Sequence, residues 1–250
     1  MIMGEGLVFF AILVAGIWKI RSSIKKELKL SQQQNNFMLS VTHELKTPLA
    51  SNKLYLQTIL KRELDKDKRE ELLQKAIAEN ERLEALIDNI LNAARLENQT
   101  FQSERTDIDL SAFIQRIIER LDGKLQDKAS RISASISPNI HVAGDKLMLD
   151  AAISNLIDNA LKYTQEGIDI ELKKEHNRVI IRVTDQGTGV PEGMEQEIFQ
   201  KFRRGGNEET RTTKGSGLGL FIASEFVKLH GGTLTYSPNV PKGAIFQITL

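Results

Sequence analysis

Apolar residues recur at intervals of three and four between Leu72 and Ala94, the spacing that places them on one face of an α-helix. The stripe consists of Leu72, Leu73, Ala76, Ile77, Asn80, Leu83, Leu86, Ile87, Ile90, Leu91 and Ala94. From residue 22 to residue 97 the chain contains one proline, Pro48, and no glycine, a composition that favours helix throughout. Charged residues replace apolar ones over residues 63–70 (ELDKDKRE), so we expect a turn there and an antiparallel helical hairpin.

One hairpin encloses little core, so its apolar faces need a partner. Pairing two copies of the chain into a four-helix bundle would bury both faces. We therefore expect a homodimer, formed by a dimerisation domain over residues 36–98.

The first twenty residues form a separate apolar segment. Glu5 is the only charged residue up to Trp18, and basic residues follow at Lys19, Arg21, Lys25, Lys26 and Lys29. A helix from Met1 to Trp18 would span roughly 27 Å, close to the ~30 Å of a bilayer's hydrocarbon core. Positive charge that follows the apolar run disfavours a secretory signal peptide and places the rest of the chain in the cytoplasm.

We accordingly expect residues 1–20 to be a single transmembrane helix that contacts lipid in the cell inner (cytoplasmic) membrane. Residues 21–35 would form a juxtamembrane helical linker, and the catalytic part would be cytoplasmic. A buried or interfacial helix is the alternative for this segment.

After residue 98 the pattern changes to shorter elements. A polar linker leads to a short strand (TDID), a helix (SAFIQRIIERL) and an alternating strand (RISASIS). A helix over residues 145–164 is followed by the strands IDIELKK and VIIRVTD, and two more strands, TLTYS and AIFQITL, end the sequence. Helices on a mixed or antiparallel sheet make an α+β sandwich, which we expect over residues 104–250.

Composition excludes several classes of protein. The chain has 34 basic and 33 acidic residues and a net charge of +1, so it carries no overall electrostatic footprint for nucleic acid, and we expect no nucleic-acid partner. It contains no cysteine, which removes disulfides, iron–sulfur clusters and thiolate zinc sites.

One candidate for chemistry lies on the first long helix, in MLSVTHELKTP. His43 is next to Glu44, and Thr47 shares the face of His43 one turn further on. Pro48 lacks an N–H group and its ring collides with the carbonyl of Glu44, so we expect the helix to bend or loosen there. An isolated histidine beside a glutamate is usually just solvated, and these two residue types alone do not assign a function.

A second candidate lies on the helix that contains NLIDNALKYT. Asn155, Asn159 and Lys162 occupy positions i, i+4 and i+7 of one face. Most polar faces of this kind are simply the solvent-exposed side of an amphipathic helix. Asparagine is a mediocre helix former without charge, however, and its amide oxygen can ligate Mg²⁺, which takes further ligands from water and phosphates.

Two glycine clusters follow. DQGTGVP comes directly after a strand, where Asp185 can accept a hydrogen bond from an exocyclic amine. GSGLGL precedes an apolar helix, and its backbone N–H groups suit phosphate, although it matches neither the Walker pattern nor a dinucleotide fingerprint. Between them, IFQKFRR predicts a short helix, and GGNEETRTTK has the composition of a lid or of an ordinary solvated loop.

Taken in order, HELKTPL, NLIDNALKYT, DQGTGV, IFQKFRR and GSGLGL resemble the H, N, first glycine, F and second glycine boxes of two-component sensor histidine kinases of the HisKA type, with a HATPase_c (GHKL) domain. In the helical region this resemblance implies that His43 is the phosphoacceptor for the γ-phosphoryl group of ATP. Glu44 would be its general base, and Thr47 would position a water in the reverse, phosphatase-type reaction. The implied partner is the receiver domain of a response regulator.

In the second domain the resemblance implies a site for ATP and Mg²⁺. Asn159 would ligate the metal, Asp185 would bind the adenine amine, and Lys162 and Arg203 would contact phosphates. The other residues expected at the nucleotide are Asn155, Tyr163, Gly187, Gly189, Gly215, Gly217, Leu218 and Gly219.

Two other interpretations stay open: a GHKL-type ATPase without kinase activity, and an inactive dimeric scaffold that docks a regulator. The family usually has two membrane spans around a sensor domain, and only one span is predicted here. The sequence does not name the stimulus or the cognate regulator, and it does not decide between cis and trans phosphorylation. His141, His176 and His230 have no second ligand at metal spacing and are predicted to be turn or surface residues.

Overall fold

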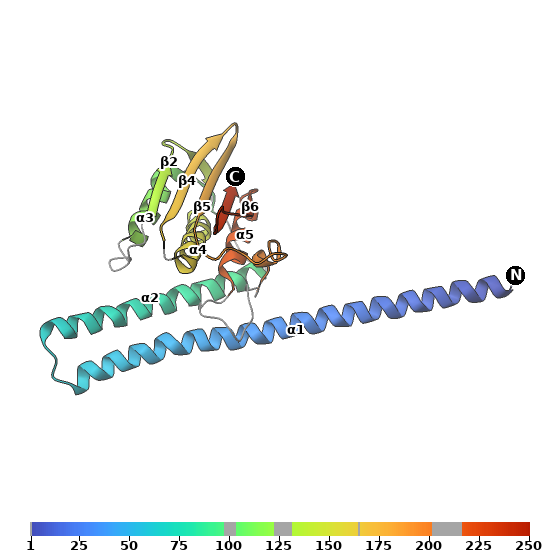
Figure 1. The fold of residues 1–250 in the computed structure, drawn as a ribbon, viewed down its shortest axis with the longest axis horizontal. Coiled ribbons are helices and arrows are strands. Elements are labelled where there is room, and N and C mark those ends of the chain that lie inside the picture. Colours follow the sequence, from blue (N-terminus) through green and yellow to red (C-terminus); the bar gives the residue numbers. More distant parts are fainter. Residues whose placement is uncertain (1, 98–103, 123–131, 165, 202–216) are drawn as a thin grey trace.

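The computed structural model describes residues 2–97, 104–122, 132–164, 166–201 and 217–250. The hairpin predicted from the apolar stripe is confirmed: α1 (Ile2–Lys61) and α2 (Lys66–Glu97) run antiparallel (Figure 1). The turn lies within the charged segment, where the Asp65 carboxylate accepts a 2.7 Å hydrogen bond from the backbone N–H of Lys68. Asp65 thereby caps the first turn of α2, which is why the second helix starts there.

The first helix is much longer than the second and extends past it toward the N-terminus (Figure 1). Residues 1–20 and 21–35, predicted as a membrane helix and a linker, belong to α1 as far as it is described. In the described part of the chain, no helix has an apolar stretch long enough, and poor enough in charge, to cross a membrane.

The second domain is built around a mixed sheet of five strands in the order β2-β4-β5-β7-β6. The strands are β2 (Ile132–Ile136), β4 (Ile168–Glu175), β5 (Arg178–Thr184), β6 (Thr233–Pro238) and β7 (Ala244–Thr249). Only β2 and β4 are parallel, and the other neighbours are antiparallel. The α+β fold predicted from the sequence is therefore confirmed.

Helices cover one face of this sheet (Figure 1). They are α3 (Leu110–Asp122), α4 (Lys146–Tyr163) and α5 (Gly219–Leu229), and a single-turn 3-10 helix, η1, spans Glu197–Phe199. A separate two-stranded sheet joins β1 (Thr106–Asp109) to β3 (His141–Gly144). The β1 strand was predicted, whereas β3 was not.

The core lies between the sheet and the helices. Inward-facing residues of β4 alternate with exposed ones, so that Ile168, Ile170 and Leu172 are buried. They pack in one cluster with Leu156 of α4 and Phe226 of α5. This packing fixes the positions of the two helices that carry the candidate site.

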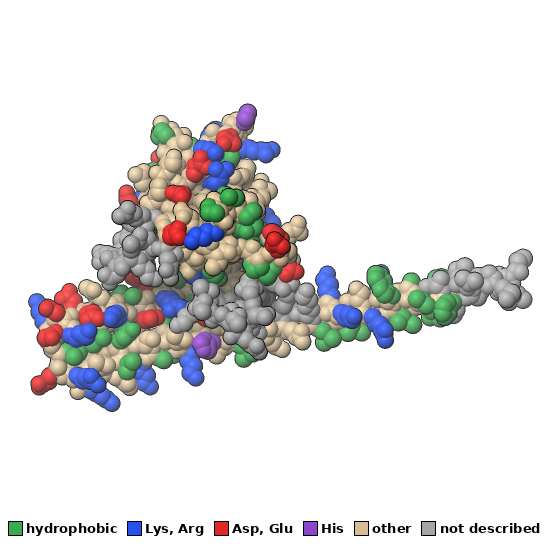
Figure 2. Space-filling model, in the orientation of Figure 1, with side chains coloured by type: hydrophobic (Ala, Val, Ile, Leu, Met, Phe, Trp, Pro, Cys, Tyr) green, Lys and Arg blue, Asp and Glu red, His purple; other side chains and the backbone are tan. Residues whose placement is uncertain are grey.

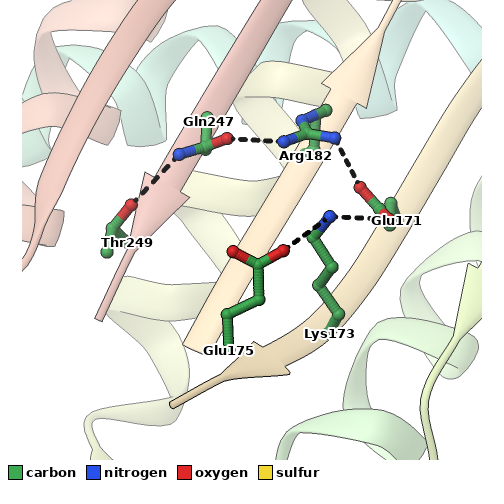
Figure 3. A network of polar contacts seen from close by, with 6 residues as sticks. All are labelled: Glu171, Lys173, Glu175, Arg182, Gln247 and Thr249. Carbon is green, nitrogen blue, oxygen red and sulfur yellow. Dashed lines mark hydrogen bonds and ion pairs between the residues drawn. The ribbon is translucent and has the colours of Figure 1, made fainter. Parts of the chain in front are cut away.

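The opposite face of the sheet is polar (Figure 3). Arg182 of β5 lies between Glu171 of β4 and Gln247 of β7, with contacts of 2.7 and 2.9 Å. Lys173 bridges Glu171 and Glu175 at 3.1 and 2.9 Å. The Arg182 contacts join neighbouring strands, whereas the Lys173 pairs lie within β4, and each of these partly exposed pairs contributes little by itself.

The second domain sits on the hairpin beside the C-terminal half of α2 (Figures 1 and 2). Ala93 of α2 is only 3% exposed and belongs to the core cluster of the second domain. Ile90 and Leu96 of α2 and Phe37 of α1 also pack against that cluster. The hairpin therefore meets the second domain through α2, which contacts α5, and Phe37, six residues before His43, packs against the cluster that Ala93 joins.

Candidate active site

The candidate histidine lies on the exposed surface of α1. His43 is exposed, while Glu44 and Thr47 are half-buried. The Thr47 hydroxyl donates a 3.1 Å hydrogen bond to the main-chain oxygen of His43, one turn back along the helix. The two residues therefore share a face, as predicted, and the imidazole is accessible for chemistry.

Pro48 is buried inside α1, and the helix continues through it without interruption. The predicted bend or loosening at Pro48 therefore does not end the helix, and it stays a prediction. The carbonyl of Glu44 loses its usual N–H donor there, but α1 as a whole packs against α2. One missing hydrogen bond is not enough to end so long a helix.

The α4 helix carries the next group of residues. Its first turn is capped by the Asp145 carboxylate, which accepts hydrogen bonds from Leu147 and Met148 at 2.9 and 3.1 Å. The apolar face of α4 is fully buried, which turns Asn155 and Asn159 to the partly exposed side.

Asn155 is tied to its surroundings. Its amide nitrogen donates to the main-chain oxygen of Ala151 at 2.8 Å and approaches the Asn89 side-chain oxygen of α2 at 3.5 Å. A Cβ added at Gly219 would lie 2.7 Å from the Asn155 amide oxygen. Asn155 is therefore the residue at which α4, α2 and the start of α5 meet.

Asn159 and its neighbours occupy the last turns of α4. The Asn159 side chain is half-buried and makes no hydrogen bond to any other described residue, so its amide oxygen can serve a ligand. Further along the same helix, the Lys162 ammonium lies 5.0 Å from the centre of the Tyr163 ring. The amide oxygen of Asn159 suits a Mg²⁺ ion that is bound to phosphates, because such an ion needs only one or two protein oxygens.

Asp185 follows β5 and is only 2% exposed. Its Oδ1 accepts hydrogen bonds from the backbone N–H groups of Gly187 and Ala244 at 2.8 and 3.2 Å. Burial raises the pKa of this carboxyl above its ordinary value, and the two backbone hydrogen bonds lower it in part. Among the described residues no hydrogen bond is made to Oδ2, which leaves that oxygen for a ligand.

The glycines after Asp185 bring its loop against α4. A Cβ at Gly187 would lie 2.4 Å from the main-chain oxygen of Tyr163, so no side chain fits there. Gly189 has a φ of +68° and lies against the carbonyl of Gly243. The structure thus brings Asp185 and the end of α4 together, as the motifs predict.

The second glycine cluster is described only in part. Gly217 has a φ of +71°, Leu218 is fully buried, and Gly219 begins α5 beside Asn155. Arg203 and Gly215, predicted at the phosphates and the lid, lie outside the described residues. In the part of the chain that is described, no group of three or more His, Cys, Asp or Glu side chains could hold a metal.

Sequence reasoning missed residues that support Asp185. The Asn239 amide donates to the Asp185 main-chain oxygen at 2.9 Å, and Gly243, with a φ of +118°, leaves room for that oxygen. Both lie in the turn between β6 and β7, a signal too short to stand out from an ordinary hairpin turn.

His230 lies in the turn after α5, as predicted, and is half-buried at a junction that the sequence did not indicate. Its Nε2 accepts a 2.9 Å hydrogen bond from the Asp145 backbone N–H, and its Nδ1 donates to the Phe226 carbonyl at 2.7 Å. The end of α5 is thereby fixed to the start of α4. A Cβ at Gly144 would collide with the ring, which explains the glycine there.

Comparison with known families identifies both regions. A model described as "His Kinase A (phospho-acceptor) domain" matches residues 33–99. A second, described as "Histidine kinase-, DNA gyrase B-, and HSP90-like ATPase", matches residues 144–250.

Two curated relatives extend the likeness over nearly the whole chain. "Sensor histidine kinase WalK" of Bacillus subtilis is 28% identical over 95% of this chain and 40% of its own length. "Sensor-like histidine kinase SenX3" of Mycobacterium tuberculosis is 27% identical over 89% of this chain and 55% of its own. The chain thus spans roughly half the length of these relatives or less.

Solved structures agree on the fold. ShkA in complex with AMPPNP matches with a TM-score of 0.60 at 23% identity, over 88% of this chain and 45% of that one. Histidine kinase AdeS of Acinetobacter baumannii matches with a TM-score of 0.57 at 22% identity, over 83% and 96%. With the phosphoacceptor and ATPase domains present in this order, the chain belongs to the sensor histidine kinases of two-component systems.

Proposed function

We propose that the chain uses ATP to phosphorylate His43 and then passes the phosphoryl group to an aspartate in the receiver domain of a response regulator. The observation that carries this proposal is the pairing, in one chain, of an exposed histidine on a helical hairpin with a domain that presents Asp185 and Asn159 for a nucleotide. Phosphoryl transfer depends mainly on positioning and charge stabilisation, which suits an acceptor and a donor held on separate elements.

In the first step a ring nitrogen of His43 attacks the γ-phosphorus of ATP. An N–P bond forms, the bond from the γ-phosphorus to the bridging oxygen breaks, and ADP leaves. Glu44 acts as the base: its carboxylate accepts a hydrogen bond from the N–H of the other ring nitrogen and takes that proton as positive charge develops on the imidazole. The accessibility of His43, with Glu44 next to it, supports these roles.

In the second domain, called the nucleotide domain from here on, Asp185 binds the adenine amine through Oδ2. Its Oδ1 accepts hydrogen bonds from Gly187 and Ala244. Lys162 and Arg203 contact phosphates, and the glycines at 215, 217 and 219 let the backbone approach them. Asn159, with Asn155 beside it, would hold Mg²⁺, whose charge neutralises the phosphate oxygens when it is bound.

A phosphatase activity toward the phosphorylated regulator is part of the proposal. Thr47 would position the attacking water on the face of α1 that His43 occupies. Its hydroxyl donates to the helix backbone and keeps its lone pairs for a water.

We also propose that the chain is a homodimer anchored in the inner membrane through residues 1–20. Support for the anchor comes from exposed apolar side chains such as Phe10, Ile12 and Trp18, which are 67, 64 and 74% exposed and are followed by basic residues. Deleting residues 1–20 should release the chain from membrane fractions. Retention of the truncated chain in those fractions would contradict the anchor.

The test of the enzymatic proposal is incubation of the chain with γ-labelled ATP and Mg²⁺, beside His43→Gln. Acid-labile, base-stable label on the parent and none on the variant is the expected result. ATP turnover that is undiminished in His43→Gln would favour a GHKL-type ATPase without kinase activity. Absence of label on both, with ATP still bound, would favour an inactive scaffold.

A further inference from the structure

The end of the β5–β7 ladder departs from regular antiparallel pairing. The register places Asp185 opposite Ala244, one step beyond the pair Thr184 and Ile245. In a regular pair of this kind the two residues exchange both backbone hydrogen bonds. Val179 and Leu250 do so at the other end of the same ladder, with two bonds of 2.9 Å.

At Asp185 only one of the two bonds is made between backbones. The Asp185 N–H donates to the Ala244 carbonyl at 2.9 Å, but the Ala244 N–H donates to the Asp185 side-chain Oδ1 at 3.2 Å. The Asp185 carboxylate therefore accepts the hydrogen bond that the Ala244 N–H would give to the Asp185 main-chain carbonyl in a regular ladder. That carbonyl needs another donor, because a partly buried acceptor left unpaired is costly.

Asn239 supplies the replacement donor. Its side-chain nitrogen lies 2.9 Å from the Asp185 main-chain oxygen. Its side-chain oxygen accepts from the Val240 N–H at 3.0 Å, and its own N–H donates to the Gly243 carbonyl at 3.1 Å. Both ends of the amide are thus assigned, and the nitrogen faces Asp185. A Cβ at Gly243 would lie 2.0 Å from the same oxygen, so glycine is needed for this approach.

We propose that Asn239 is a positioning residue for recognition of the nucleobase. By donating to the Asp185 main-chain carbonyl, the Asn239 amide keeps that carbonyl from pairing with the Ala244 N–H. The Asp185 carboxylate therefore keeps this N–H as a donor, stays fixed and presents Oδ2 to the exocyclic amine of adenine. Without the Asn239 amide, the carbonyl recaptures the Ala244 N–H, Oδ1 loses one of its two donors and the carboxylate turns. This inference rests on the proposed binding of ATP at Asp185.

In an Asn239→Ala variant, this change of hydrogen-bond partners should affect the stability of the fold and the recognition of adenine to different extents. The lost hydrogen bond from Asn239 is replaced by a regular ladder bond, so the fold is affected little. Recognition of the adenine amine is affected strongly, because it depends on the orientation of the carboxylate. Replacement of a residue with a merely structural role would instead lower the stability of the fold strongly and change the recognition of the adenine amine little.

The experiment uses the full chain and measures binding of ATP and of purine riboside triphosphate, which lacks the exocyclic amine, by calorimetry. The parent should prefer ATP by about tenfold or more, as expected for a hydrogen bond to a charged group. In Asn239→Ala this preference should fall to within about twofold, with affinity for the purine analogue unchanged, since only the amine contact is lost. The melting temperature should stay within roughly 2 °C.

Asn177→Ala is the matched control, because Asn177 lies exposed in the turn between β4 and β5. It should keep the full preference for ATP. In an Asp185→Asn background, Asn239→Ala should cause no further loss of preference, because both residues act through one contact.

An unchanged ATP preference in Asn239→Ala would overturn the inference, as would an equal loss of both nucleotides together with a large drop in melting temperature. A parent chain that binds ATP without any preference over the analogue would contradict the adenine role of Asp185 in the proposed function, and the inference with it. Loss of preference in Asp185→Asn but not in Asn239→Ala would overturn the inference alone.

Discussion

The helical hairpin and the nucleotide domain bury their apolar residues to very different extents. Among the described residues of the hairpin, the buried apolar side chains are Val41, Leu72, Ala76 and Ala93, together with Pro48. The nucleotide domain encloses a continuous core whose fully buried side chains include Leu110, Ile114, Leu149, Ile153, Leu156, Ile157, Ile168, Ile170, Leu172, Ile181, Phe226 and Phe246.

The difference shows what each region needs. The nucleotide domain buries most of its apolar residues among its own elements, with Ala93 of α2 added at the edge of its core. The hairpin leaves a row of apolar side chains exposed, including Leu49, Leu54, Leu56, Ile77, Ile87 and Leu91 at 46–61%. Green side chains are also visible along the α1 arm in Figure 2. Exposed apolar faces of this kind favour a partner, which supports the proposed pairing with a second copy of the hairpin.

The largest effect is expected in the nucleotide domain, at Asp185. Asp185→Asn should weaken ATP binding by about tenfold to a hundredfold, because the acceptor for the adenine amine becomes partly a donor. Labelling of His43 should fall in parallel at subsaturating ATP, while the hairpin is unaffected. Calorimetry and labelling measure both, and full ATP affinity in the variant would contradict the assignment.

The same variant should be more stable than the parent at pH 7. The folded chain raises the pKa of Asp185 through burial, so the stability contributed by this group is complete below its ordinary pKa and is lost as pH rises through the raised pKa. The amide that replaces the carboxyl in Asp185→Asn does not ionise, so the gain should shrink as pH falls through the pKa of Asp185. Melting temperatures across the acid range measure this, and a gain that grows toward acid would contradict it.

The next largest effect is expected in the hairpin. Ile87→Lys places a charge on the exposed apolar face and should weaken the dimer by more than about tenfold, since each copy loses roughly 1.5–3 kcal/mol of apolar burial. Leu147→Lys is the matched control, because Leu147 is 83% exposed in the nucleotide domain. Sedimentation should show dissociation for Ile87→Lys only, and equal behaviour of the two variants would contradict the bundle.

A smaller effect is expected where the two regions touch. Ala93→Leu should overpack the contact between α2 and the nucleotide domain at a cost of about 1–3 kcal/mol. Hydrogen exchange should rise around Ile90 and Leu96, while ATP affinity stays unchanged. Ala94→Leu is the control, since Ala94 is exposed. Similar exchange in both variants would show that the contact is not specific.

The smallest effect is expected at His230, inside the nucleotide domain. His230→Leu removes the acceptor for the Asp145 N–H and should cost about 1 kcal/mol, seen as a melting temperature lowered by a few degrees. His141→Gln, on the exposed β3 strand, should leave the melting temperature unchanged. If both variants melt like the parent, the junction between α4 and α5 does not depend on His230.

Prediction from sequence succeeded where one physical signal dominates. The apolar stripe of α2 and the alternation in β4 each bury one face, so the hairpin and the sheet followed from periodicity. The bend or loosening expected at Pro48 stays a prediction, since one lost hydrogen bond does not end a long helix that packs against another. The β3 strand was missed because its four residues pair with a distant segment, β1, and carry little pattern of their own.

In the candidate site, the motifs predicted the residues that we propose to face a ligand but not the residues that hold them in place. Asp185 and Asn159 stand out because their residue types are unusual at a strand end and on a helix face. Asn239 and His230 act through backbone groups of residues 54 and 85 positions away, as their hydrogen bonds to Asp185 and Asp145 show. No local pattern encodes such contacts.

The measurement that tests the division between the two regions most directly is nucleotide binding by His43→Gln, made beside its labelling by γ-labelled ATP. The account predicts no label on His43→Gln and an affinity for ATP within about twofold of the parent, because the histidine lies on the hairpin, outside the nucleotide domain. Acid-labile label that persists on His43→Gln would contradict it, since the phosphoryl group would then be carried by another residue.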